Sequence, residues 1–600
     1  MMRSASLKLI VLLLFMLPAP VYGAFSEQVA TDTKAISLAN AVTADPPGLM
    51  SAHYNPAGLS LLPEGKTFSN GVAFVRIERK GILREDPDFE GFLNETWGPD
   101  APYNPDDPLS AHGGPDPLAD TEGSADTNRM ALPFYGPFDT PILFAPNLGI
   151  SSKEKDSKWT FAYANYVPHG AGLAHRDAGD PMRYGCKSLY LIHLVYAAPT
   201  AAYQVSDELA IGASVGMGQT VMGMELDQRT PNELVGLTRV IGDATRDLEI
   251  PVVSEQTLPP PFLGGGLGPY EYNTRLQMDL RDDFSPSFNL GLLWRPRNWF
   301  SFGVTYQSET SSEITGDYSF EYSEQFQRMV NWNGRTPMTL QTAGMLDLPI
   351  NGVPSQTGSV TATQIFPRRV QTGIMVKPLN KLKLLFDLHW ADWSAVKEDR
   401  FEFDQDIQLF RLAKLMGYTG GNRALVVQRR MEDTWHWSVG MEYQATNWLS
   451  LRAGYSKRPT STQKDLFDAL YFMPDVDFYG AGIGLRLPKK MKLDLGLGYL
   501  VNKSKKIDNN ESTNLNSTDF TKIVYNPYAG LDYEQELEIF MGSFTVTMPL
   551  EVQMEMIHHQ MEMTHHAVEG IKKLIGKLNP FSGEDETEKK DDTEDDEHAH

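Results

Sequence analysis

The sequence predicts an all-β fold, a 14-stranded antiparallel transmembrane β-barrel, on three observations. Apolar and polar residues alternate with a period of two along many segments, because successive side chains of a strand point to opposite faces. Most of these segments are ten residues or longer, whereas strands of soluble sheets centre on about five or six. Aromatic residues gather near the segment ends, and short connections alternate with long ones, as in outer-membrane barrels.

The chain begins with a predicted secretory signal peptide over residues 1–24, with Arg3 and Lys8 before a short apolar core. That core is too short to cross a bilayer as a helix, and no later run of 18 or more apolar residues predicts such a helix. The single cysteine, Cys186, excludes an internal disulfide framework. The net charge of −24 argues against nucleic acid as a partner.

Residues 284–307 show the alternation most clearly. Phe288 and Leu290 share one face of the first half, while Ser287 and Asn289 share the other. The second half repeats the pattern after a four-residue turn, which predicts a hairpin with an apolar and a polar face. The polar faces along the chain are rich in glycine and serine, as a wet or plugged lumen allows.

The same pattern predicts a barrel over residues 66–550. Its fourteen strands are expected near 66–79, 140–152, 158–168, 186–204, 207–225, 273–295, 298–322, 364–378, 381–407, 424–446, 447–460, 474–488, 491–506 and 531–550. Short periplasmic turns and long extracellular loops alternate between these strands. An even strand count puts both termini in the periplasm of a Gram-negative-type cell, with the barrel in its outer membrane.

An ordered set of segments resembles one family. The motif "NPAG" at residues 55–58 precedes the first strand, and "NLGISSKEKDSKWTFAYANYVPHG", "SFNLGLLWRPRNWFSFGVTYQSE" and "LHWADWS" follow in that order. Together they resemble the FadL-type outer-membrane transporters of long-chain fatty acids and other hydrophobic compounds, which include toluene-transport members. The resemblance covers residues 27–549.

The resemblance implies that residues 25–65 fold into the barrel as a hatch. Proline fixes one backbone dihedral and glycine tolerates unusual ones, so Asn55, Pro56, Ala57 and Gly58 are expected to form its turn. The resemblance also implies passive uptake: capture among the extracellular loops, transfer to an internal apolar pocket, hatch movement and lateral release beside a kinked third strand. The break at residues 166–168 marks either that kink or the end of the strand.

Candidate substrate-binding residues come from the hatch and from two long loops. Exposed apolar side chains there form either a capture surface or a packed cap over the barrel mouth. The residues are Leu49, Met50, Tyr54 and Leu59 in the hatch, Phe262, Leu263 and Leu267 in the first loop, and Met338, Leu340 and Leu346 in the second. Arg368, Arg369, Arg429 and Arg430 could meet a substrate carboxylate, although most are expected to be solvated rim charges.

Enzymatic motifs are weak, and we expect no enzyme and no cofactor. "GGGLG" at residues 264–268 opens no helix, so it does not predict a phosphate-binding loop. Asp387 and His389 share an inward strand face, which a polar lumen produces by chance more often than a hydrolase dyad. A barrel enzyme acting on lipids and an adhesin or assembly scaffold are the alternative functions.

The C-terminal extension, residues 551–600, departs from the family pattern. It is predicted to be a periplasmic helix to about residue 578, followed by an acidic disordered tail with ten acidic residues and two lysines over residues 584–600. Imidazole and thioether groups suit copper or nickel, so a metal site is a weak alternative to an amphipathic helix that meets a periplasmic partner. The candidate ligands are His558, His559, Met563, His565 and His566. The expected partners are the hydrophobic substrate, outer-membrane lipid and lipopolysaccharide, and the barrel-assembly machinery, and the barrel is expected to be a monomer.

Overall fold

The computed structural model describes residues 31–89, 92, 116–132, 136–248, 250–253, 256–471, 473–519 and 526–578. The predicted signal peptide and the acidic tail lie outside these residues.

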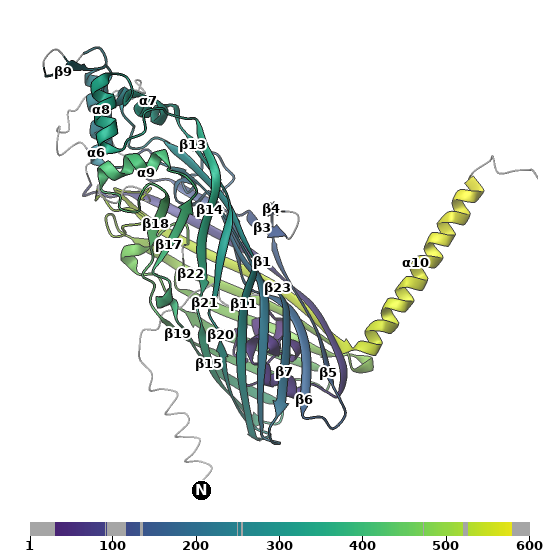
Figure 1. Cartoon of the computed structure of the whole chain (residues 1–600). Helices are drawn as coiled ribbons and strands as arrows, with labels where there is room; N and C mark the ends of the chain where they lie inside the picture. The colour runs from purple at the N-terminus through teal and green to yellow at the C-terminus, as the bar shows by residue number, and fades with distance from the viewer. Residues whose placement is uncertain are drawn as a thin grey trace, which may run out of the picture.

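Fourteen antiparallel strands form one closed barrel, which confirms the predicted fold class (Figure 1). Four of them are interrupted and carry two labels each. The strands are β1 (Gly65–Glu85), β5 (Leu143–Lys153), β6 (Trp159–Ala174), β7 (Ser188–Gln204), β8 (Leu209–Gln228), β11 (Thr274–Arg297), β12 (Phe300–Gln307) with β13 (Thr310–Tyr322), β14 (Ser355–Phe366) with β15 (Arg369–Leu379), β16 (Leu382–Ala391) with β17 (Glu398–Phe403), β18 (Ala424–Gln428) with β19 (Thr434–Gln444), β20 (Leu449–Arg458), β21 (Val476–Arg486), β22 (Lys492–Ile507) and β23 (Leu531–Pro549).

The first strand closes the barrel by pairing on both sides. β1 pairs with β5 and, from Thr67↔Pro549 to Glu85↔Leu531, with the last strand β23. The alternation places apolar side chains outward: Phe288 and Leu290 are 43% and 48% exposed, whereas Asn289 between them is 7% exposed. A band of exposed apolar side chains on a closed sheet is the surface that a bilayer requires.

The strand near residues 364–378 is longer than the sequence analysis predicted, because β14 begins at Ser355. Its first half alternates buried Val360 and Ala362 with Ser359 and Thr361. A strand half that extends into water needs no outward apolar residues. The outward apolar side chains that mark a membrane strand are therefore absent there.

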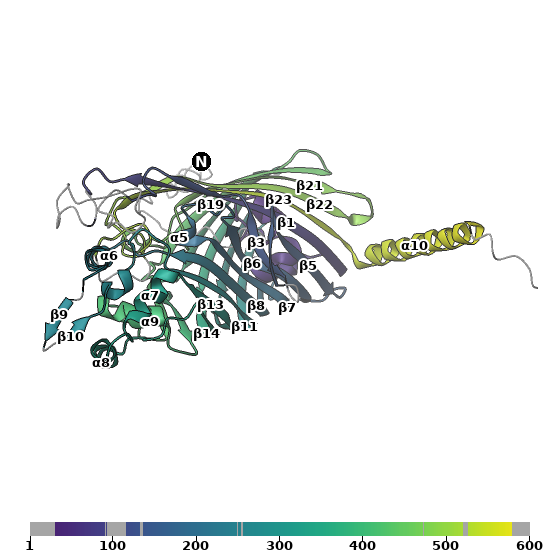
Figure 2. The ribbon, with the colours of Figure 1, turned by 90° about the horizontal axis from the view of Figure 1, so that it is seen from above.

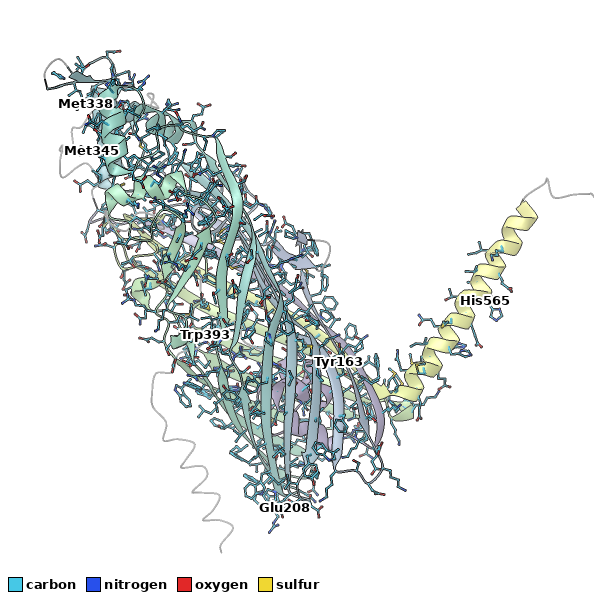
Figure 3. The ribbon with its side chains drawn as sticks, in the orientation of Figure 1. Tyr163, Glu208, Met338, Met345, Trp393 and His565 are labelled. Carbon is cyan, nitrogen blue, oxygen red and sulfur yellow. The ribbon has the colours of Figure 1, made fainter. Side chains whose placement is uncertain are left out.

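The long connections gather at one end of the barrel and the short turns at the other (Figures 1 and 2). In Figure 3, Met338 and Met345 lie at the loop end, and Glu208, in the β7–β8 turn, lies at the opposite end. The loop end contains α5 (Arg183–Cys186), α6 (Glu233–Ala244), β9 (Ile250–Val253), β10 (Gln256–Leu258), η3 (Phe262–Gly265), α7 (Glu324–Trp332), α8 (Pro337–Leu346), α9 (Gln408–Ala413), η5 (Lys414–Met416) and η6 (Lys464–Leu466).

Three short elements follow β1 and lie against the wall of the barrel. β2 (Glu122–Ala125) pairs with the upper part of β1, and β3 (Asn128–Leu132) and β4 (Gly136–Thr140) form a hairpin. Two further short helices interrupt strand connections, η4 (Trp393–Ala395) and η7 (Pro488–Lys490).

Residues 31–62, here called the luminal segment, lie inside the barrel (Figure 1, purple). The segment contains α2 (Thr33–Ser37), η1 (Gly48–Met50), α3 (Ser51–Tyr54) and η2 (Pro56–Leu61). Asp32 begins α2 by accepting hydrogen bonds from the amides of Lys34 and Ala35.

The last helix, α10 (Leu550–Leu578), continues directly from β23 and projects away from the barrel (Figures 1 and 2). Among helices in the described part of the chain, none combines the length and hydrophobicity that crossing a bilayer requires.

The gathering of loops at one end predicts which connections face the outside of the cell. A protease site inserted after Leu248, which is 62% exposed between α6 and β9, should be cut on intact cells. A matched site in the β11–β12 turn, after Arg297, should be cut only when the outer membrane is permeabilised. Cleavage of the Arg297 site on intact cells would reverse this topology.

Candidate functional site

Asn55 fixes the turn of the luminal segment to the barrel wall. Its side-chain amide donates to the carbonyl oxygens of Thr43 (2.9 Å) and Leu292 of β11 (3.1 Å). Its side-chain oxygen accepts from the amide of Ala57 at 3.2 Å, and Pro56 occupies the first position of η2. The side chain is fully buried, and buried amides are costly without such partners.

Asp387 on β16, three strands along the barrel from β11, also holds the segment. Its carboxylate accepts hydrogen bonds from the backbone amides of Val42 (2.8 Å) and Thr43 (2.7 Å). His389 stacks on His436, with ring centroids 4.4 Å apart, and its Nε2 lies 3.4 Å from Ser438 Oγ. Asp387 therefore positions the backbone of the luminal segment. Its carboxylate makes none of the described contacts of His389, which a hydrolase dyad would require.

Glycines on the inner wall let the segment's backbone approach the strands closely. A methyl group added at Gly454 of β20 would overlap the backbone of Leu38, and one at Gly480 of β21 would overlap the carbonyl oxygen of Ile36. Gly212 of β8 faces Pro56 in the same way. The glycine-rich polar faces in the sequence thus reflect a filled lumen rather than a wet one at this level.

An ion-pair network joins the segment to the barrel at the turn end. Asp45 lies 2.9 Å from Lys34 and 2.8 Å from Lys383 of β16, and Lys383 also pairs with Glu442 of β19. Arg452 of β20 continues the network from Glu442. Burial opposes ionisation of Asp45, but the two ammonium groups outweigh it and lower the pKa of this carboxyl below its usual range.

On the loop side of the segment lies an apolar pocket of about 70 Å³. Strands and loops share its lining, and Trp393 of η4 is marked in Figure 3. Its apolar residues are Ile77, Ala171, Leu173, Leu189, Leu191, Ile365, Phe366, Trp393, Val396, Met431, Leu470 and Met473, with Gln364, Asp399 and Tyr471 as polar neighbours.

A small polar cavity of about 40 Å³ separates this pocket from the segment. His53 of the segment, His169, His193 and Arg369 line it, and Arg369 donates to His169 Nε2 at 2.6 Å. Burial, reinforced by nearby Arg369, lowers the pKa of His53 to about 3, so its imidazole is neutral at physiological pH. Arg369 is 4% exposed and Arg429 is 1% exposed, so these two of the four arginines are not the solvated rim charges that were expected for most of them.

Strand pairing is incomplete between β5 and β6. Their ladder runs only from Leu148↔Asn165 to Ser152↔Phe161, the shortest between consecutive barrel strands, although β6 continues to Ala174. The β6–β7 register shifts on both sides of Tyr166, next to Pro168, which cannot donate to a ladder. The break at residues 166–168 is therefore an irregularity within the strand and not its end.

A cavity of about 1040 Å³ occupies this unpaired region. Val75 and Ile77, which are buried inward-facing residues of β1, line one part. Leu194 and Val221 line another part, and they alternate with the buried His193 and Thr220, so they belong to the outer face of β7 and β8. The cavity thus reaches both faces of the barrel wall.

The predicted site residues lie at several levels. Leu49 and Met50 line a polar cavity of about 760 Å³ at the turn end, and Tyr54 and Leu59 pack on wall residues such as Ala164. Phe262 packs on Trp332 with ring centroids 5.1 Å apart, in the η3 loop that also carries Leu263 and the buried Leu267. In α8, Leu340 and Leu346 are 47% and 48% exposed, and the half-buried Met338 starts the same helix.

Within the described part of the chain, none of the predicted substrate-binding residues lines the apolar pocket. Phe366, Met431 and Met473 were missed because they come from strand interruptions and loops, where no periodicity marks an inward face. The motif "LHWADWS" contains Trp393 and was the available signal.

The candidate metal ligands lie on α10, which is exposed over the described side chains. His558 and His565 each pair with a glutamate one turn later, at 3.2 and 3.7 Å, and His559 lies 4.0 Å from Glu562. Across the described part of the chain, no group of three or more His, Cys, Asp or Glu side chains is placed to hold a metal ion.

A closed antiparallel barrel with an outward apolar band is the architecture of an outer-membrane protein. The sequence model of the family described as "Outer membrane protein transport protein (OMPP1/FadL/TodX)" matches residues 23–548. The chain belongs to this family.

Solved structures share the fold at low identity. A Pseudomonas aeruginosa FadL homologue is 16% identical, with a TM-score of 0.57 over 88% of this chain and 99% of that one. The P. putida toluene transporter TodX is also 16% identical, with a TM-score of 0.54 over 87% and 99% of the two chains. Among curated proteins, none matches this chain significantly.

Replacing Asp387 with alanine should loosen the luminal segment without unfolding the barrel. The change leaves the two buried amides of Val42 and Thr43 without their acceptor, at about 1–3 kcal/mol each. We expect larger and noisier single-channel conductance in planar bilayers. Ser438→Ala, at the residue that pairs with Asp387 on β19, is the matched control. Equal conductance of both variants and the wild type would contradict this role of Asp387.

Proposed function

We propose that this protein takes up hydrophobic compounds passively across the outer membrane and releases them sideways through the gap between β5 and β6. The observation that carries the proposal is continuity: Ile77 and Ala171 line both the internal apolar pocket and the cavity that crosses the wall. The pocket and the cavity therefore adjoin at these two side chains, and a compound in the pocket would pass them on its way to the outer face of β7 and β8.

Capture would begin at α8, at the loop end. Leu340, Met345 and Leu346 are 47%, 80% and 48% exposed there, and exposed apolar patches on a soluble surface mark interaction sites. Fatty acids and toluene-like hydrocarbons are both candidate substrates. Structures of similar fold include a toluene transporter, and an apolar pocket discriminates weakly among such compounds.

The luminal segment would serve as the hatch. Its position blocks the straight path to the turn end, where the polar cavity below it contains Lys34 and Asp45. An apolar compound that entered that cavity would displace water from its charged groups, so the lateral path is energetically preferred. Movement of the segment must break the Asp387 hydrogen bonds or the Asp45 ion pairs.

Covalently bridging the gap should stop transport. In the register of the paired region, Pro146 would face Val167, and both line the cavity. Cells with Pro146→Cys and Val167→Cys should lose most uptake of labelled oleate or toluene after treatment with bismaleimidoethane. Ile150→Cys with Tyr163→Cys bridges a position already paired and should leave uptake unchanged. Normal uptake through a fully bridged gap would refute lateral release.

Altering the hatch turn should also change uptake, through the hatch and not through the gap between β5 and β6. Asn55→Ala with Pro56→Ala removes three hydrogen bonds and the fixed dihedral of η2. We expect altered uptake of the same compounds while the barrel remains heat-modifiable on gels. Unchanged uptake would mean that the turn is only structural.

A further inference from the structure

An apolar seam runs along α10 with heptad spacing. Its positions are separated alternately by four and three residues over three heptads, the pattern of a left-handed coiled coil. The seam consists of Leu550, Met554, Ile557, Met561, Thr564, Val568 and Ile571. Met554, Ile557, Met561, Val568 and Ile571 are 39–66% exposed, so the described structure leaves the seam uncovered.

We propose that the seam is an interface between copies of this chain: the α10 helices of neighbouring barrels form a parallel coiled coil. Copies inserted in one membrane share one orientation, and in each copy the helix starts directly after β23. Glu555 lies 2.8 Å from Lys489 of η7, so the first turns are tied to the barrel rim. Equivalent residues therefore start at the same level in every copy, as a parallel in-register bundle requires.

The seam residues indicate more than two strands. Two of the three a positions hold the unbranched Met554 and Met561, and the third holds Val568. The d positions after Leu550 hold the β-branched Ile557, Thr564 and Ile571. A side chain without β-branching at a, such as leucine, with isoleucine at d favours three or four strands over two.

The residues beside the seam fit a second copy. In a parallel bundle, position g of one helix faces position e of the next, which here pairs Gln553 with His558 and Gln560 with His565. No like charges meet at these positions at neutral pH. The acidic residues of the same stretch, such as Glu562, lie on the far side, where Glu562 pairs with His558 of its own helix.

The same arrangement disfavours a lipid surface as the occupant. Helices that lie on membranes have a wide apolar face and a polar face rich in lysine and arginine. On α10 the exposed Met556 and Met563 extend the apolar face beyond the seam, but the polar face carries Glu555, Glu562 and Glu569 in place of lysine or arginine. An acidic face gains no attraction from anionic lipid.

Disulfide trapping in native outer membranes tests the interface. Ile557→Cys, at a d position, should give a disulfide-linked homodimer on oxidation, because d residues face each other across a parallel seam. Glu562→Cys, on the far side of the same helix, should give little. The native Cys186 is fully buried and can remain in place.

Light scattering of the purified full chain in detergent tests the copy number. We expect a protein mass of three or four chains, which falls to one chain in Met561→Glu with Val568→Glu and in a chain ending at Val552. The matched change His559→Glu with His566→Glu, away from the seam, should keep the oligomer. A single-chain mass for the full protein, or an Ile557→Cys variant that cross-links only to a chain of another mass, would overturn the proposal. Because uptake is not measured, failure here leaves the proposed function untouched.

Discussion

The structure depends on one constraint: inside a bilayer no water is available to pair with a backbone group. Closure of β1 onto β23 satisfies it for the first and last strands. Where the β5–β6 ladder ends, the start of β3 and the residue before it supply other partners. Asn128 donates to the carbonyl oxygen of Ile77 at 2.9 Å, and the amide of Ala174 donates to Thr127. The wall thus opens without leaving the adjoining strands unsupported.

The contacts that hold the luminal segment differ in kind. The glycine wall determines where the segment's backbone can lie, because only glycine leaves that space. Asp387 and the Asp45 network hold it with polar interactions that can be exchanged for water if the lumen hydrates. The shape of the glycine wall therefore determines the position of the luminal segment, and the polar contacts determine how easily the segment leaves that position.

The strand pattern could be predicted from the sequence because each membrane strand must face lipid on one side. The same rule fails beyond the membrane, as at Ser355–Ser359, where neither face requires apolar residues. The site was predicted less well. Phe366 and Met473 reach the pocket only through strand breaks and loop packing. Asp387 was weighed only as a partner of His389 on the same strand face, because the backbone amides that it binds lie far away in the sequence.

The filled lumen has a consequence for biogenesis. The luminal segment precedes all fourteen strands in the chain, yet it contacts glycines on β20 and β21, near the end of the barrel sequence. Because β1 pairs with both β5 and β23, the pairing of β1 with β23 closes the barrel and seals its interior. The segment must enter before β1 and β23 pair. The order of folding events, and not stability alone, therefore decides whether the lumen of a newly made barrel is filled or empty.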